Sequence, residues 1–182
     1  MPRVEDRNPP SDRVMTLPNA LTLFRLLMVP VVVGLLLAEA DGIAVAVFVA
    51  AALTDFLDGR IARRQGPTRL GQLLDPVADR LMLSSSAIVL AIRGLLPVWA
   101  VAILVGRDVL ALLGSFLVRG KMRVNVVGKA ATAVLMVSVG IVIFSPGALG
   151  ETIFYAGCVL SLAAAALYAV GFYLLADRGE IP

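Results

Sequence analysis

The sequence predicts an all-α membrane protein in which six transmembrane helices form a single bundle. Three observations favour this fold class. Of the 182 residues, 59% are hydrophobic and only 16% are charged, which is atypical of a soluble domain. The mean hydropathy is +0.92. Six apolar runs follow one another, each long enough to cross a hydrocarbon core of about 30 Å, and no β-strand alternation is visible.

These runs divide the chain into a tail and one domain. Residues 1–14 are polar, contain prolines and carry both charges, so we expect a disordered cytoplasmic tail. Residues 15–178 contain no long linker and are predicted to form one membrane domain. The first run extends from Leu17 to about Ala38, and its long, partly acidic leader disfavours the competing interpretation as a signal peptide. The later runs cover residues 43–62, 73–92, 97–118, 127–145 and 151–175.

The distribution of basic residues predicts the orientation, because cytoplasmic loops are enriched in Lys and Arg. With the N-terminus inside, the outer loops hold Glu39, Asp41, Glu151 and a single cation, Arg93. We therefore expect both termini on the cytoplasmic side of the cell membrane. The net charge of +3 follows from this topology and does not indicate a nucleic-acid partner. The inner segments hold Arg3, Arg7, Arg13, Arg60, Arg63, Arg64, Arg69, Arg119, Lys121, Arg123, Lys129 and Arg178.

Composition also limits the chemistry. The sequence contains no histidine, so a histidine base, nucleophile or metal ligand is excluded. Its single cysteine, Cys158, excludes an internal disulfide and a multi-cysteine zinc site. Reactive groups must therefore be carboxylates, hydroxyls, lysines or arginines.

Two pairs of aspartates border apolar runs. Asp55 and Asp58 are three residues apart, and Asp75 and Asp79 are four apart, so each pair occupies one face of a helix. Carboxylates near lipid are costly, and they indicate a functional site. Two such helices joined by a short basic loop would direct all four carboxylates to one point.

Four adjacent carboxylates repel one another unless a cation lies between them. Oxygen ligands suit Mg²⁺, Mn²⁺ or Ca²⁺ better than zinc, and two metals sharing carboxylates are typical of phosphoryl chemistry. Gly59 and Gly71 allow a ligand to approach closely. The pattern therefore predicts a two-metal site for a phosphate compound. Nearby cations suited to phosphate are Arg60, Arg63, Arg64 and Arg69.

The aspartates belong to a longer string, Asp55-x-x-Asp58-Gly59-x-x-Ala62-Arg63…Gly71-x-x-x-Asp75-x-x-x-Asp79. This string resembles the signature of the CDP-alcohol phosphatidyltransferase family, whose size and helix number the chain also fits. One departure is present: seven residues, 64–70, separate the arginine from the second glycine, where the family usually has eight. A deletion in a loop is tolerable.

The resemblance implies a transferase that moves a phosphatidyl group from CDP-diacylglycerol to an alcohol and releases CMP, with Mg²⁺ or Mn²⁺ as cofactor. Asp55, Asp58 and Asp75 resemble the primary metal ligands. Asp79 resembles the family's fourth aspartate, which is both a further metal ligand and the candidate general base. The cavity would face the cytoplasm, and a homodimer is implied. Positions resembling the nucleotide site are Asp55, Asp58, Gly59, Ala62, Arg63, Gly71, Asn19 and Thr22.

The segments 17–22 and 73–79 most resemble the phosphatidylglycerophosphate synthase and cardiolipin synthase branches. Glycerol 3-phosphate is the first expected acceptor, because basic residues are available to bind its phosphate. Phosphatidylglycerol, which would give cardiolipin, is the alternative. The candidate acceptor-binding residues are Lys129, Arg119, Lys121, Arg123 and Arg69.

Three further charges have more than one interpretation. Arg25 either extends to the lipid headgroups or borders the nucleotide site. Arg107 and Asp108 are consecutive and do not share a helix face, so we expect each to pair with a different helix or to line a polar cavity. An ion-coupled transporter is a remote alternative function, since the acids flank a loop and no inverted repeat is visible.

Overall fold

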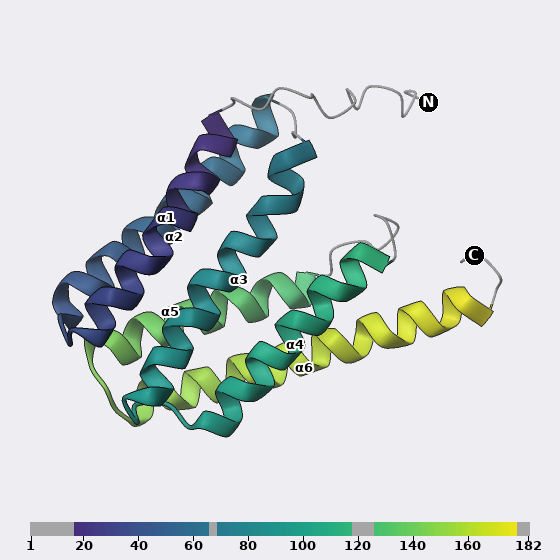
Figure 1. Cartoon of the computed structure of the whole chain (residues 1–182). Coiled ribbons are helices and arrows are strands. Elements are labelled where there is room, and N and C mark those ends of the chain that lie inside the picture. Colours follow the sequence, from purple (N-terminus) through teal and green to yellow (C-terminus); the bar gives the residue numbers. More distant parts are fainter. Residues whose placement is uncertain (1–16, 66–68, 118–125, 178–182) are drawn as a thin grey trace.

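The computed structural model describes residues 17–65, 69–117 and 126–177, and these residues form six α-helices without a β-strand (Figure 1). The all-α class is therefore confirmed, and the helices follow the six apolar runs closely. The tail at residues 1–14 lies outside the described residues. The helices are α1 (Leu17–Leu37), α2 (Asp41–Gln65), α3 (Arg69–Ile92), α4 (Val98–Leu117), α5 (Val126–Phe144) and α6 (Ala148–Asp177).

Two helices in the described part of the chain are long and apolar enough to cross a membrane. They are α1 over Ala20–Leu37 and α6 over Ala148–Leu167. Shorter apolar segments occur in α2 at Asp41–Thr54 and in α5 at Ala130–Phe144. The predicted number of helices, six, is therefore found in the described residues. That all six cross the membrane stays a prediction.

Successive helices run in alternating directions. The connections at 38–40, 93–97 and 145–147 consequently lie at one end of the molecule, at the lower left of Figure 1. Helix α1 packs on α2 and α3, while α3 also packs on α4 and α5. Helices α5 and α6 form a close pair, with α2 on α5 and α4 on α6. The α1–α2 pair is thus joined to the rest of the bundle through α3, which packs on α4 and α5, and through α2, which packs on α5.

Tight turns keep two of these connections short. The second residue after α1, Glu39, and the second residue after α3, Gly94, both adopt left-handed backbone conformations, with φ of 57° and 74°. In the first turn the Ala40 amide donates to the Leu35 carbonyl at 2.9 Å, which satisfies a terminal carbonyl of α1. A helix can therefore reverse direction within a few residues.

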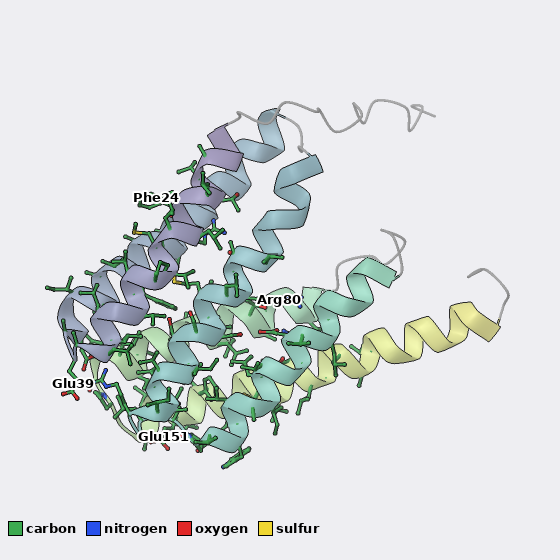
Figure 2. All side chains as sticks on the ribbon, viewed as in Figure 1. Phe24, Glu39, Arg80 and Glu151 are labelled. Atoms are coloured by element: carbon green, nitrogen blue, oxygen red, sulfur yellow. The ribbon has the colours of Figure 1, made fainter. Side chains whose placement is uncertain are left out.

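The outer surface of the bundle is strongly apolar. Leu110 is 70% exposed and Phe144 is 77% exposed, and Phe24 projects outward from α1 (Figure 2). Most buried residues of the described part are apolar as well, but the interior also holds polar and charged side chains. A strongly apolar surface around buried charges is atypical of a soluble protein and is typical of a lipid-facing surface. The buried polar residues are Thr22, Arg25, Ser86, Asp108, Ser138 and Ser161.

An ion pair joins α2 to the turn after α3. The two terminal nitrogens of Arg93 donate to Asp41 at 2.6 and 2.9 Å. These hydrogen bonds hold the pKa of Asp41 below its ordinary value. The pair therefore contributes fully to stability at pH values above the ordinary aspartate pKa. This contribution is lost as the pH falls through the lowered pKa of Asp41. Glu39 and Glu151 lie at this same end of the bundle (Figure 2).

Two glycines bring α5 and α6 close together. A Cβ atom placed on Gly157 would lie 2.8 Å from the Leu135 side chain and 3.3 Å from its backbone nitrogen. A Cβ atom on Gly150 would lie 2.5 Å from Val142. Small residues at the contact between two membrane helices allow their backbones to approach one another.

We predict that Gly157→Ala lowers the thermal unfolding temperature of the detergent-solubilised protein. Overpacking costs about 1–3 kcal/mol, and the Leu135 backbone cannot move away without shifting α5. Gly140→Ala is the matched control, since a Cβ there meets no atom within 4 Å and alanine favours a helix. An unfolding temperature for Gly157→Ala at or above that of Gly140→Ala would contradict the close contact.

Candidate active site

The four aspartates of the motif lie on α2 and α3. Asp55 precedes the last residue of α2 by ten positions, and Asp79 follows the first residue of α3 by ten. At 1.5 Å per residue, each lies about 15 Å from the end of its helix. Since three residues join these ends, the two aspartates are predicted to lie at matching heights. The side chains of Asp55, Asp58 and Asp75 lie outside the described part of the structure, so their convergence stays a prediction.

Asp79 forms an ion pair with Arg25 of α1. A terminal nitrogen of Arg25 donates to a carboxylate oxygen of Asp79 at 2.5 Å. Arg25 is 1% exposed, and the Asp79 side chain is 25% exposed. Thr22, one turn earlier on α1, is also buried. The expectation that Arg25 extends to the lipid headgroups is therefore wrong, because a buried guanidinium needs a counter-ion and Asp79 provides it.

A second group of charges lies between α3 and α4, and we call it the α3–α4 polar cluster: Arg80, Ser84, Arg107 and Asp108. Arg80, labelled in Figure 2, donates to the Asp108 carbonyl oxygen at 2.9 Å. The Asp108 carboxylate accepts from Ser84 at 3.2 Å and from Arg107 at 2.7 Å. Asp108 is only 4% exposed. Arg80 directly follows Asp79 in the sequence, so the cluster begins one residue from the proposed metal ligand Asp79.

The outcome for Arg107 and Asp108 differs in part from expectation. Asp108 pairs with a different helix, as predicted, through Ser84 of α3. Arg107 instead binds its own neighbour, Asp108. The long, flexible arginine side chain reaches around the helix, although the two Cβ atoms point in different directions. Sequence reasoning missed Arg80 and Ser84, whose four-residue spacing on α3 was an available signal of a shared face.

For several of the remaining candidate residues the structure gives the helix but not the position of the side chain. Asn19 belongs to α1, Lys129 to α5, and the others to α2 and α3, but these side chains lie outside the described part. Gly128, next to Lys129, accepts a hydrogen bond from Thr132 at 3.0 Å. The α2 and α3 residues are Gly59, Ala62, Arg63, Arg69 and Gly71. Arg119, Lys121 and Arg123 lie outside the described residues altogether.

The available donors fit a magnesium or manganese ion. Among the residues whose side chains are described, no three His, Cys, Asp or Glu form a metal-binding group. The motif, however, supplies carboxylates alone, and hard oxygen donors are those that Mg²⁺ and Mn²⁺ prefer. The partial exposure of Asp79 leaves it accessible beside α1. The residues that would hold the metal are Asp55, Asp58, Asp75 and Asp79.

Comparisons with known proteins identify the family of the chain. A family model described as CDP-alcohol phosphatidyltransferase matches residues 15–170. The chain is 36% identical over 176 residues to cardiolipin synthase (CMP-forming) of Streptomyces coelicolor, covering 90% of this chain and 78% of that protein. It is 42% identical over 133 residues to a putative cardiolipin synthase of Mycobacterium bovis, covering 69% of this chain and 63% of the relative.

The similarity extends to a human protein. Cardiolipin synthase (CMP-forming) of Homo sapiens is 40% identical over 106 residues, which are 57% of this chain and 35% of the human protein. The prediction of a CDP-diacylglycerol-dependent phosphatidyltransferase of the phosphatidylglycerophosphate and cardiolipin synthase branch is confirmed. The chain belongs to the CDP-alcohol phosphatidyltransferase family.

Proposed function

We propose that the protein is a cardiolipin synthase, which transfers the phosphatidyl group of CDP-diacylglycerol to phosphatidylglycerol and releases CMP. The observation that carries this proposal is the similarity to CMP-forming cardiolipin synthase over 90% of the chain. It reverses the order of acceptors expected from the sequence, where basic residues favoured glycerol 3-phosphate. The residues behind that expectation, Lys129 among them, have side chains outside the described part.

We further infer that all six helices cross the cell membrane, with both termini and the active site on the cytoplasmic side. The apolar exterior and the charged side chains buried in the bundle support this placement. So does the contrast between the two ends of the bundle. Acidic Glu39 and Glu151 lie at the end with the short connections, whereas the basic motif residues belong to the opposite ends of α2 and α3.

In the proposed reaction, Asp79 accepts the proton of the phosphatidylglycerol hydroxyl. The resulting oxygen attacks the phosphorus of the phosphatidyl group, and the bond from that phosphorus to the CMP oxygen breaks. Arg25 positions the Asp79 carboxylate through their ion pair. Mg²⁺ or Mn²⁺, when held by the four aspartates, would neutralise the pyrophosphate and the departing CMP. The proposed nucleotide-binding residues are Asn19, Thr22, Asp55, Asp58, Gly59, Ala62, Arg63 and Gly71.

The topology is tested by cysteine accessibility. The only native cysteine, Cys158, is buried and can be replaced by alanine as background. A cysteine introduced at Gly147 should react with an impermeant reagent from outside intact cells. One introduced at Gly66 should react only after the cytoplasmic face is opened. The opposite pattern would overturn the proposed orientation of the site.

Replacement of Asp79 separates binding from chemistry. Asp79→Asn keeps the shape of the side chain but cannot accept a proton, so kcat should fall at least about 100-fold. The KM for CDP-diacylglycerol should change much less than kcat, because three other aspartates remain to hold the metal. Asp58→Asn, a proposed metal ligand without a base role, should instead weaken metal and nucleotide binding as well. A kcat near wild type for Asp79→Asn would show that another group is the base.

The acceptor is identified by product analysis. Purified protein in detergent, with labelled CDP-diacylglycerol, should release CMP and form cardiolipin when phosphatidylglycerol is added. A chelator should abolish the reaction, and Mg²⁺ or Mn²⁺ should restore it. Formation of phosphatidylglycerophosphate from glycerol 3-phosphate, with phosphatidylglycerol inactive, would overturn the proposed acceptor. Full activity in excess chelator would overturn the metal site.

A further inference from the structure

The α3–α4 polar cluster has no part in the function proposed so far, although it is costly to build. Arg107 lies ten residues before the last residue of α4, and therefore about 15 Å from that helix end. The side chains of Arg107 and Asp108 are 11% and 5% exposed. Charges at this depth are expensive in a membrane protein and usually mark a substrate path or a reaction centre.

The hydrogen bonds of the cluster orient Arg107 without using all its donors. Asp108 accepts at both carboxylate oxygens, from Arg107 and Ser84, and at its carbonyl from Arg80. A guanidinium has five N–H donors. Among the described residues, Arg107 donates from one terminal nitrogen, to Asp108. The other donors of Arg107 are not among the fully buried unpaired atoms of the described residues, so they are open to a ligand, and the ligand that best fits a guanidinium is an anionic phosphate.

The cluster is also close in the fold to the proposed base. Arg80 directly follows Asp79, and its 2.9 Å hydrogen bond to Asp108 fixes α4 against that turn of α3. In phosphatidylglycerol, one glycerol unit separates the reacting hydroxyl from the phosphate. When the hydroxyl lies at Asp79, the acceptor phosphate must therefore lie within one glycerol length of it. Arg107 directly precedes Asp108, so it is a cation on the turn of α4 that Arg80 holds against this part of α3.

We propose that Arg107 binds the phosphate of the acceptor and that Asp108, together with Ser84, is the positioning pair that orients it. The proposal rests on the proposed function and names the group that selects an anionic acceptor. It differs from the sequence prediction, which placed this role on Lys129 and nearby cations at the cytoplasmic mouth. A deep cation suits a lipid acceptor, because both lipid phosphates must meet at the height of Asp79.

The test compares two acceptors that differ in one methyl group and in the negative charge that this group removes. Phosphatidylglycerol carries one negative phosphate, and its methyl phosphotriester is neutral. The wild type should prefer the charged acceptor, and Arg107→Gln should raise the KM for phosphatidylglycerol by about tenfold or more. The KM for the triester and that for CDP-diacylglycerol should stay unchanged. Arg107→Lys, which keeps the charge but not the fork of donors, should retain part of the preference.

Two further variants test the positioning role. Asp108→Asn and Ser84→Ala should raise the KM for phosphatidylglycerol less than Arg107→Gln does, again without affecting the triester. Gly106→Ala is the matched control on α4, since a Cβ there meets no atom within 4 Å. It should leave every KM unchanged, and thermal unfolding of each variant shows that it is folded.

Several outcomes would overturn the proposal. An equal loss of activity with both acceptors in Arg107→Gln would mean that the cluster only braces α3 against α4. An unchanged preference for the charged acceptor would remove Arg107 from the site. If Arg107→Gln does not fold, the same comparison with Arg107→Lys decides, and an unaltered preference there overturns the proposal.

The proposed function can fail separately. If the wild type uses glycerol 3-phosphate and not phosphatidylglycerol, the lipid acceptor is wrong, and glycerol becomes the uncharged probe for Arg107. Loss of the charge preference in Arg107→Gln would then support the phosphate role with a different acceptor. If the wild type releases CMP with neither acceptor, the proposed function and this inference are both overturned.

Discussion

The ion pair between Arg25 and Asp79 is the interaction on which the arrangement of the site depends. Each charge alone would be costly in an apolar bundle, and together they satisfy one another across α1 and α3. Helix α1 is otherwise almost wholly apolar, so Arg25 defines which of its faces turns inward. The pair therefore fixes the rotation of α1 and the position of the proposed base at the same time.

The same constraint extends from α3 to α4. Arg80 and Asp79 are consecutive, so their side chains leave α3 in different directions, one toward α4 and the other toward α1. Among the side chains that the structure describes in this layer, each charge has a partner on a neighbouring residue or helix. Low dielectric makes such networks costly when they are incomplete, so the bundle tolerates few alternative packings at this height. A rigid layer of this kind is suited to holding two lipid phosphates in register.

The sequence predicted the helices well because apolar runs of membrane length leave little ambiguity. Pro30 did not end α1, since helices in apolar surroundings tolerate proline when neighbouring helices support the freed carbonyl. The motif aspartates were identified by spacing alone. The partners of Arg25 and Arg107 were not predictable, because they depend on which helices pack together and on how far a flexible guanidinium reaches. The acceptor could not be decided from the sequence for a related reason, since basic residues near a loop indicate topology as readily as substrate.

Charge is distributed unevenly along the helices. Helices α2 and α3 concentrate their charges in the halves near residues 55–80, whereas α1 and α6 remain apolar over most of their length. Toward the end with the short connections the helices pack closely, since Gly150 and Gly157 bring α6 against α5. The close apolar contacts between helices are thus largely separate from the helix halves that carry the motif charges.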